Sequence, residues 1–384
     1  MSKLEKLIER YCPDGVEYYK IKDVYKRIKG TPITAGKMKE IATPDGSVRI
    51  FAGGKTVINA NEKDIPNANI TRVPAVLVQS RGVIDAVYYD KPFTFKNEMW
   101  AYTTFNQKSV KYLYYILKSN IQTFRDAASG MGALPQISLG VTEEFEIPVP
   151  PLPVQEEIVR VLDAFTELQA ELQAELQKRK QQYNFYRDNL LNFKDINRGG
   201  QEIKWMKMSE IGNNLDKKRK PITAGKRESG QIPYYGASGI VDYVKDYLFD
   251  GDYLLVSEDG ANLLTRTYPI AFSIHGKTWV NNHAHVIEFK ERATRKYVEY
   301  YLNSIDLSPW ISAGAQPKLT QDSLNKLTIP VPPLAEQQRI VSILDRFDTL
   351  TNDLTSGLPA EIEKRRQQYE FYRDKLLTFK RKKA

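Results

Sequence analysis

The strongest constraint on this chain is an internal duplication. IPVPPLPVQEEIVRVLDAF at residues 147–165 returns almost unchanged as IPVPPLAEQQRIVSILDRF at residues 329–347. KRKQQYNFYRDNLLNFK at 178–194 likewise returns as KRRQQYEFYRDKLLTFK at 364–380. Weaker matches precede them in the same order, such as GTPITAGK with RKPITAGK and GALPQIS with GAQPKLT. Each half is therefore a divergent segment followed by a near-identical one, and we expect one structural unit built twice.

The near-identical segments have the periodicity of a coiled coil. From Ile158 to Phe193, mostly apolar and aromatic positions follow one another at alternating steps of four and three residues, which is the spacing of a helix seam. The preceding PVPPLP stretch is a stiff, non-helical stop, because proline fixes its own φ and extends its neighbour. The second copy has four extra residues near Gly357 and Pro359, where we predict a break and a new helix starting at Pro359. The predicted seam contains Ile158, Leu162, Phe165, Leu172, Leu176, Tyr183 and Leu190 in the first copy, and Ile340, Leu344, Phe347, Leu354, Tyr369 and Leu376 in the second.

Two long helices with apolar seams bury them most economically by antiparallel pairing with each other. A continuous helix over residues 154–194 would be roughly 60 Å long at about 1.5 Å per residue. We predict an α+β fold with two mostly β domains, separated by two long antiparallel helices that form a coiled coil with a pseudo-twofold internal repeat. The predicted boundaries are 1–146 and 199–328 for the β domains, and 147–198 and 329–384 for the helical regions. An ordinary helical hairpin between two enzyme domains is the alternative interpretation.

Composition and charge restrict the class of protein. The chain has 384 residues and a net charge of +9, which favours polyanionic partners. Its apolar runs are far shorter than the roughly 20 residues that span a bilayer, so no membrane segment is expected. The N-terminal MSKLEKLIERY lacks the apolar middle of a secretory signal, and the single Cys12 cannot form an internal disulfide. These features predict a globular, cytoplasmic protein.

The repeated motif resembles the conserved region of a known protein family. The pattern I-P-V-P-P-L-x-x-Q-x-x-I-V-x-x-L-D-x-F, present twice, resembles the conserved region of specificity subunits of type I restriction-modification enzymes. CPDGVEYYKI at 12–21 resembles the start of many such subunits. IPYYGASGIVDYV at 232–244 and NNHAHVI at 281–287 resemble a common type of target-recognition domain. The resemblance spans essentially the whole chain.

The resemblance implies a DNA-reading role. Each half would contain a target-recognition domain that reads one part of a split, asymmetric sequence in double-stranded DNA. The helices would fix the unread spacer and bind two modification (methyltransferase) subunits, and restriction (nuclease) subunits would then join. The specificity subunit itself would catalyse no reaction. The recognition domains would resemble the small, curved, mostly β domain of adenine-N6 methyltransferases.

Local sequence patterns indicate candidate base-reading loops. PAVLVQSRGVIDAVYY at 74–89 and DYLLVSEDGAN at 252–262 have the pattern of strands that lead into glycine-containing loops. Alignment at Gly82 and Gly260 places Gln79, Ser80 and Arg81 opposite Ser257, Glu258 and Asp259. Loops that match in position and differ in side chains are expected where each reads different bases, although solvated loop residues would look the same. Arginine pairs with guanine, glutamine with adenine, and acidic groups with the amino group of cytosine.

Further DNA contacts are expected from basic and aromatic residues outside these loops. Basic side chains bind phosphate and fix affinity and register rather than sequence. The candidates for phosphate contacts are Lys37, Arg49, Lys55, Arg72, Lys96, Lys217, Lys218, Arg219, Lys220, Lys226, Arg227, Arg266, Lys277 and Lys318, and solvated surface charge is the alternative for each. Tyr234, Tyr235 and His283 complete the predicted DNA-binding set.

Metal and catalytic sites are not expected. His283 and His285 would share one strand face, but no cysteine or histidine cluster accompanies them, so we predict DNA contact or core packing. GTPITAGKM has five residues between its glycines and a methionine after Lys37, which does not fit a phosphate-binding loop. The chain contains no Asn-Pro-Pro-aromatic tetrapeptide for methyl transfer to adenine, and we expect no cofactor. Two hypotheses remain: a DNA-reading subunit of a methyltransferase and nuclease complex, or a stand-alone DNA-binding or scaffold protein.

Overall fold

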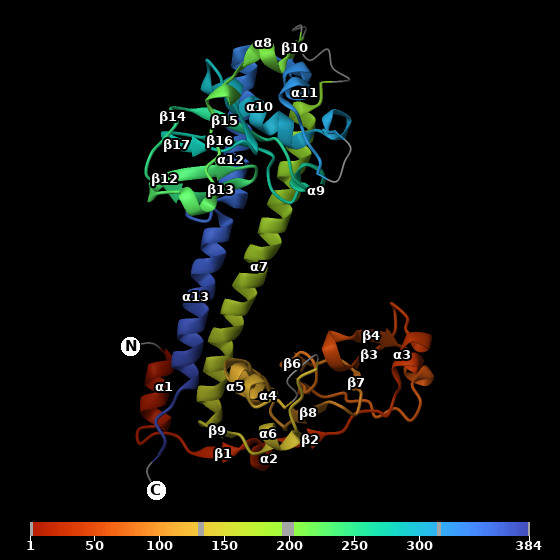
Figure 1. Cartoon of the computed structure of the whole chain (residues 1–384). Helices are drawn as coiled ribbons and strands as arrows, with labels where there is room; N and C mark the ends of the chain where they lie inside the picture. The colour runs from red at the N-terminus through yellow and green to blue at the C-terminus, as the bar shows by residue number, and fades with distance from the viewer. Residues whose placement is uncertain (1–2, 130–133, 194–202, 313–315, 383–384) are drawn as a thin grey trace. The chain divides into compact units, whose positions relative to one another are not determined.

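The computed structural model describes residues 3–129, 134–193, 203–312 and 316–382 (Figure 1). The chain forms two compact units. Unit 1 comprises Met1–Leu172 and Ile362–Ala384, and unit 2 comprises Gln173–Glu361. The helices therefore contribute to both units, and the predicted boundary between residues 198 and 199 lies outside the described residues. Within the described ranges, none of the helices combines the length and apolar character needed to cross a bilayer.

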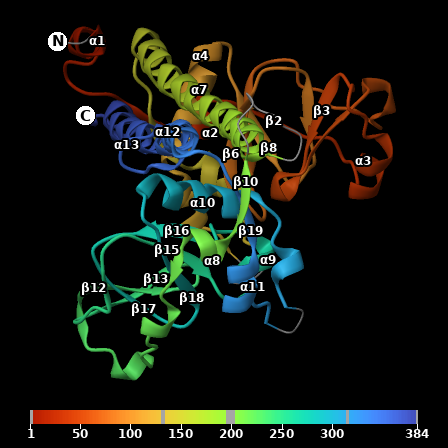
Figure 2. The same ribbon diagram turned by 90° about the horizontal axis from the view of Figure 1, so that it is seen from above.

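The main body of unit 1 is built from a four-stranded and a three-stranded sheet. The first has the order β2-β8-β5-β6 and is antiparallel throughout. The second has the order β4-β3-β7, in which β3 and β4 form a hairpin and β7 runs parallel to β3. Figure 2 shows β3 and helix α3 (Ala35–Ile41) together at one side of this unit. The strands are β2 (Lys26–Ile28), β3 (Val48–Phe51), β4 (Val57–Ala60), β5 (Ala75–Gln79), β6 (Asp85–Tyr89), β7 (Phe93–Phe95) and β8 (Trp100–Thr103).

Unit 2 repeats this topology. Its first sheet has the order β11-β18-β15-β16, and its second has the order β13-β12-β17-β14, with β17 again parallel to the first strand of the hairpin. The edge strand β14 is added to the pattern of unit 1. The divergent halves therefore share one fold. The strands are β11 (Asn213–Asn214), β12 (Ser229–Gly236), β13 (Gly239–Val244), β14 (Phe249–Asp250), β15 (Tyr253–Ser257), β16 (Ala271–Ile274), β17 (Lys277–Val280) and β18 (Ala284–Glu288).

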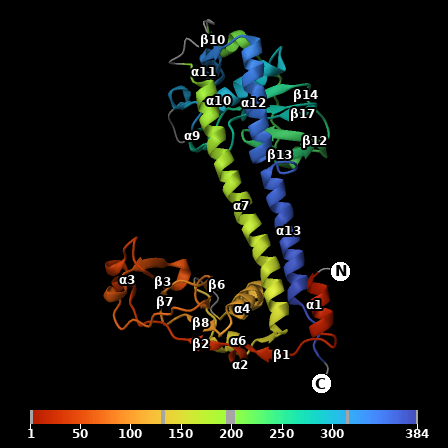
Figure 3. The same ribbon diagram turned by 180° about the vertical axis from the view of Figure 1, so that it is seen from behind.

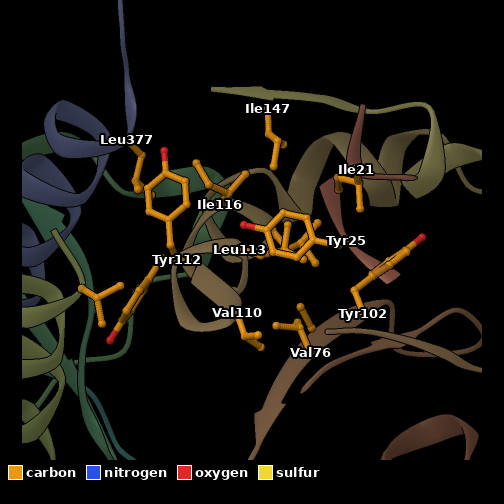
Figure 4. Packing of buried hydrophobic residues seen from close by; sticks show 14 of the residues in the cluster. Ile21, Tyr25, Val76, Tyr102, Val110, Tyr112, Leu113, Ile116, Ile147 and Leu377 are labelled. Atoms are coloured by element: carbon orange, nitrogen blue, oxygen red, sulfur yellow. The ribbon is translucent and has the colours of Figure 1, made fainter. Parts of the chain in front are cut away.

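One amphipathic helix covers the first sheet of each unit: α4 (Gln107–Ser119) in unit 1 and α10 (Arg292–Ser304) in unit 2. The Asn106 side chain caps α4 by accepting hydrogen bonds from two backbone N–H groups of its first turn. Figure 4 shows Val110 of α4 beside Val76 of the sheet, with Leu113 and Ile116 in the same buried cluster. Each such side chain contributes about 1.5–3 kcal/mol on burial.

Shorter helices complete the units. They are α1 (Lys3–Tyr11), α2 (Ile21–Val24), α5 (Ile121–Asp126), α6 (Leu139–Glu143), α8 (Met208–Ile211), α9 (Asn262–Thr265) and α11 (Gln321–Lys326). The single-turn 3-10 helices are η1 (Gly53–Lys55), η2 (Glu62–Asp64), η3 (Asp216–Lys218), η4 (Ala224–Lys226) and η5 (Ser308–Trp310).

A two-stranded ribbon leads into the long helix of each repeat. In unit 1, β1 (Tyr18–Lys20) pairs with β9 (Glu146–Pro148), and in unit 2, β10 (Lys204–Lys207) pairs with β19 (Thr328–Val331). The proline-rich stretch ends each ribbon, and a buried glutamine then fixes the first helical turn. Gln155 Nε2 donates to the Pro150 carbonyl at 2.7 Å, and Gln337 Nε2 donates to the Pro332 carbonyl at 2.8 Å. The predicted stop is confirmed up to Pro151 and Pro333. The prediction that the whole PVPPLP stretch is non-helical is wrong for Leu152 and Pro153, which form the start of α7.

The long helices are α7 (Leu152–Leu191), α12 (Leu334–Asn352) and α13 (Leu358–Leu377). In unit 1, the first half of α7 runs antiparallel beside α13 (Figure 3), and Phe165 contacts Tyr369 and Tyr372. In unit 2, the second half of α7 lies beside α12, where Tyr183 and Tyr186 contact Phe347. The antiparallel pairing predicted from the repeat is therefore present in each unit. Buried seam residues are Ile158, Leu162, Leu176, Leu190, Ile340 and Leu344, whereas Leu172, Tyr183, Tyr369 and Leu376 are partly buried.

The break in the second helix falls where the sequence predicts it. Pro359 is the second residue of α13, and Gly357 lies in the turn that precedes it. A Cβ at Gly357 would lie 2.3 Å from the Thr349 carbonyl oxygen, so only glycine fits this close backbone approach. The prediction that Leu354 belongs to the seam is wrong. Because α12 ends at Asn352, Leu354 falls in the turn, and 80% of it is exposed.

Candidate nucleic-acid interface

Three loops meet at equivalent places in the two units. The first loop follows β3 or β12 and comprises residues 52–56 or 237–238. The second loop follows β5 or β15 and comprises residues 80–84 or 258–261. The third loop follows β7 or β17 and comprises residues 96–99 or 281–283. Because the two units share strand order and strand direction, the three loops lie close together in each unit.

Backbone hydrogen bonds hold the second loop in the same way in both units. The Gly82 N–H donates to the Pro135 carbonyl at 2.9 Å, and the Gly260 N–H donates to the Pro317 carbonyl at 3.1 Å. Both glycines have positive φ, +76° and +104°, which disfavours other residues. The alignment of the halves at these two glycines is therefore confirmed by the structure.

Side chains of unit 1 connect the three loops. Ser80 Oγ donates to the Glu98 carbonyl, which joins the second loop to the third. The Gly53 N–H donates to Glu98 Oε1 at 3.3 Å, which joins the first loop to the third. Lys96 Nζ lies 3.1 Å from Glu98 Oε2. Arg81 is exposed at the surface of this assembly.

Unit 2 connects its loops through different groups. Ser257 Oγ donates to the Ala237 carbonyl at 2.5 Å, and the Asn281 N–H donates to the Tyr235 carbonyl at 3.0 Å. At the surface, His283 Nδ1 lies 2.9 Å from the carboxylate of Asp259. Alignment of the third loops at Asn97 and Asn282 places Glu98 opposite His283. The second and third loops of unit 2 therefore form a side-chain pair at the positions that Arg81 and Glu98 occupy in unit 1.

A buried charge network supports the second loop of unit 2. Arg219 lies 2.6 Å from Glu258 and 3.2 Å from Asp216, and Lys318 lies 3.0 Å from the other oxygen of Glu258. Burial raises the pKa of Glu258, but hydrogen bonds from Arg219 and Lys318 and nearby positive charge outweigh it and hold that pKa below its usual range. The carboxylates are therefore ionised and internally paired.

His285 completes this network. Its Nε2 lies 2.8 Å from the Leu319 carbonyl, which only accepts, so Nε2 carries a hydrogen; its Nδ1 lies 2.6 Å from Asp216 Oδ2. Burial raises the pKa of Asp216, but the hydrogen bond and charge of His285, the Val286 N–H and Arg219 together lower it. Asp216, Glu258 and His285 bring ligand atoms within 4.8 Å of one another. Because Arg219 already neutralises the carboxylates and both ring nitrogens have partners, the geometry favours an ion-pair network over a metal site.

Several predicted DNA contacts are corrected by burial. Gln79 is buried within the central strand β5, and the hydroxyls of Ser80 and Ser257 are bound to carbonyls of their own chain. The buried Tyr234 hydroxyl accepts from the Ile222 N–H at 3.0 Å, with the Arg227 guanidinium over its ring. These side chains position loops and do not reach a surface.

Three further charged residues that were predicted to contact DNA form hydrogen bonds or ion pairs within the chain. The buried Glu258 and the mostly buried Arg219 are partners in the network described above. Arg266 donates to the Ile305 carbonyl at 2.9 Å, at the end of α10. For these three residues a structural role replaces the predicted contact with DNA, because their hydrogen-bonding groups are already used.

The remaining candidates stay predictions. Lys217, Lys218, Lys220, Lys226 and Lys277 are exposed, as are Arg81 and His283. Others have an acidic or amide neighbour: Lys37 with Glu40, Arg72 with Glu62, Lys96 with Glu98, Arg227 with Asp242, Lys318 with Glu258 and Arg49 with Asn59. Tyr235 is partly buried, and the backbone of Lys55 lies in η1. Sequence reasoning missed Asp216, because it belongs to no motif and its partner His285 lies 69 positions along the chain. Asn281 opens the NNHAHVI stretch but was not singled out.

The long helices present a second repeated surface. Phe185 and Tyr186 of α7 correspond to Phe371 and Tyr372 of α13 in the shared QQYxFYRD motif. Phe185 is 64% exposed and Phe371 is 63% exposed, and each packs edge-on against its neighbouring tyrosine. The same aromatic position is therefore exposed in both repeats.

Comparisons with known proteins agree with this architecture. Residues 13–179 and 201–364 match the sequence profile of the type I restriction modification DNA specificity domain. The specificity subunit of the Escherichia coli type I restriction enzyme EcoR124I/EcoR124II is 35% identical over 302 residues, which cover 71% of this chain and 72% of that protein. The Haemophilus influenzae protein S.HindORF215P, which carries a type I specificity-subunit name, is 41% identical over 182 residues. That match covers 46% of this chain and about half of the relative, 47% of its length.

A solved structure shows the same fold. The crystal structure of a type I restriction-modification S subunit from M. genitalium superposes with a TM-score of 0.63 at 18% identity, covering 94% of this chain and 95% of that one. The fold, the repeated loops and the two profile matches lead to one conclusion: this chain belongs to the family of type I restriction-modification specificity subunits and carries the family's specificity domain twice.

Proposed function

We propose that this chain is the DNA-reading subunit of a type I restriction-modification complex, and that each unit recognises one part of a bipartite, asymmetric target in double-stranded DNA. The observation that carries the proposal is the repeated set of three loops. The two sets share strand topology and backbone hydrogen bonds, yet their side chains differ: the exposed Arg81 stands opposite the mostly buried Asp259, and Glu98 stands opposite the exposed His283. One scaffold with two different sets of surface groups is suited to recognising two different base sequences.

The proposal assigns the domains as the sequence predicts them. Residues 1–146 and 199–328 are the two target-recognition domains, and 147–198 and 329–384 are the helical regions that set the spacer. The surface lysines at positions 217, 218, 220 and 226 contact phosphates in this scheme and supply affinity without sequence information. The net charge of +9 supports such contacts.

The partners in the proposal follow from the repeated helical surface. One modification (methyltransferase) subunit docks on Phe185 and its neighbours, and a second docks on Phe371 and its neighbours. Restriction subunits then join the complex. This chain contributes recognition and no catalysis, and the methyl transfer and the cleavage belong to its partners.

Co-expression with a type I modification (methyltransferase) subunit, followed by mapping of methylated adenines in host DNA, tests the proposal. A methylated sequence in two parts supports it. Replacement of residues 205–320 by the same region of a relative should change one half of the sequence and leave the other half unchanged. Methylation that is independent of this chain would contradict the proposal and favour a stand-alone binding or scaffold protein.

A further inference from the structure

The exposed histidine of unit 2 is held by a carboxylate from another loop. His283 Nδ1 lies 2.9 Å from both oxygens of Asp259. The side chain of His283 is 46% exposed, whereas that of Asp259 is 14% exposed. The histidine therefore forms the outer partner of the pair and the aspartate its more buried support.

This contact fixes the hydrogen-bonding pattern of the ring. An imidazole nitrogen with a free lone pair would be repelled by the carboxylate, so Nδ1 carries a hydrogen and donates it to Asp259. In the neutral ring the hydrogen is then absent from Nε2, which is left as an acceptor. Within the described parts of the chain, Nε2 has no hydrogen-bond partner, so it is available to a ligand.

Backbone contacts hold both members of the pair in place. The His283 N–H donates to Asn281 Oδ1 at 2.8 Å, and Asp259 forms a β-bridge with Lys318. Behind Asp259, Glu258 is fixed by Arg219 and Lys318. The loops that carry the pair are thereby preorganised, which favours selective recognition.

The equivalent positions of unit 1 have the opposite chemistry. Arg81 replaces Asp259 and is an exposed donor, while Glu98 replaces His283 and is bound to the first and third loops. Unit 1 therefore offers a guanidinium to acceptor groups of a base. Unit 2 offers a ring nitrogen that accepts.

We propose that His283 is a specificity-determining residue that reads an exocyclic amino group, of adenine or cytosine, through Nε2 in the major groove. Adenine N6 and cytosine N4 are the donors that this groove displays. Asp259 is the positioning residue that keeps the hydrogen on Nδ1. The inference rests on the proposed function, since it names a base feature read by one unit.

The test uses the full-length chain assembled with its modification subunits and a pool of DNA duplexes randomised at both half-sites. Selected sequences should contain adenine or cytosine at one position of the half-site of unit 2. His283→Ala should reduce the preference at that position by about tenfold, the effect of one lost hydrogen bond, and should leave the half-site of unit 1 unchanged. Arg81→Ala is the matched control and should affect only the half-site of unit 1.

Two variants of Asp259 separate ring chemistry from folding. Asp259→Ala frees the hydrogen to move to Nε2, so preference should shift toward guanine or thymine, which display acceptors. Asp259→Asn keeps an oxygen for the Nδ1 hydrogen and should retain the original preference. Nitrogen chemical shifts of the ring should show the hydrogen on Nδ1, and the chain has only 3 histidines to assign.

The outcomes distinguish failure of the His283 assignment from failure of the proposed function. Sequence-selective binding by the unaltered complex, with base preference unchanged in His283→Ala, would overturn the assignment of His283 alone. A ring hydrogen on Nε2 in the neutral state would overturn it as well. Absence of any sequence preference in the unaltered complex would contradict the proposed function itself.

Discussion

Phe165 stacks on Tyr372 in unit 1, with ring centroids 5.6 Å apart and planes inclined by 25°. In unit 2, Phe347 stacks on Tyr186 at 5.5 Å and 28°. Phe165 and Phe347 occupy one position of the repeated motif, and Tyr372 and Tyr186 occupy another. One contact is thus made twice with the partners exchanged, which is the pattern that antiparallel pairing of two repeats produces.

Loss of either stacked pair should weaken the helix pairing. We expect Phe165→Ala and Phe347→Ala each to lower the free energy of unfolding by about 1–3 kcal/mol, because each removes a partly buried ring and an aromatic contact. Denaturant unfolding followed by circular dichroism measures this. Phe185→Ala is the control, since that exposed ring should change stability by only about 0.5 kcal/mol or less. Equal losses for all three variants would contradict the assigned seam.

Substitution of the exposed Phe185 or Phe371 should weaken binding of the modification subunits rather than folding. Phe371→Ala should cost about 2 kcal/mol or more in binding of one modification subunit if it is an interface anchor, with the stability of the isolated chain unchanged. Native mass spectrometry should then show one bound subunit for Phe371→Ala or Phe185→Ala, and none for the double variant, at concentrations where the unaltered chain binds two. Full assembly of the double variant would refute the docking surface.

Arg81 gives a prediction for the half-site of unit 1. If its exposed guanidinium pairs with guanine, Arg81→Ala should lose about 1–3 kcal/mol of discrimination at one base pair. Competition binding with single-base variants of the target measures the loss. Arg72→Ala is a useful comparison, because a phosphate contact should weaken binding to all sequences alike. Unchanged discrimination in Arg81→Ala would rule out this base contact.

The ion pairs of Glu157 predict an acid-sensitive part of the stability. The pKa of Glu157 is lowered to about 2, chiefly by a hydrogen bond from Arg160 at 2.6 Å. Burial raises this pKa, but a second hydrogen bond, from Lys3 at 2.8 Å, lowers it further. A carboxyl group whose pKa is lower in the folded than in the unfolded state stabilises the fold fully at pH values above its unfolded pKa, which for Glu157 is near the usual 4.5. That contribution should be lost as the pH falls from about 4.5 to 2. Glu157→Gln should be less stable than the unaltered chain at pH 7 and should show a flatter loss of stability over that range, as thermal unfolding at several pH values can show.

Gly357 tests the turn between α12 and α13. Gly357→Ala places a Cβ 2.3 Å from the Thr349 carbonyl oxygen and 2.9 Å from that of Asp353, so the turn must shift. We expect a loss of about 1–3 kcal/mol in the free energy of unfolding, as for other overpacked sites. Gly225→Ala is the matched control, because a Cβ there meets no atom within 4 Å. Equal stability of the two variants would show that the turn adapts without cost.

Much of the helical architecture could be read from local patterns. The seam spacing, the proline stop and the break at Gly357 and Pro359 depend on residues close together in the chain, whose geometry is fixed by helix periodicity and by proline and glycine conformations. Leu354 shows the limit of such reading. It continues the period in the sequence, but the turn removes it from the helix, and a side chain in that turn faces solvent.

The sequence by itself determined that one unit is built twice, that the halves end in paired helices, and where the two variable loops correspond. Only the tertiary structure decided which loop side chains reach the surface and which support it. Ser257 and Tyr234 had the composition of contact residues but lie buried, because central strands carry their side chains inward. Ser80, in the loop after β5, is buried with its hydroxyl bound to the Glu98 carbonyl. Asp259 meets His283 from 24 positions away, and Asp216 meets His285 from 69 positions away. Such pairs depend on strand order and register, which arise from packing of the whole sheet and leave no local signal in the sequence.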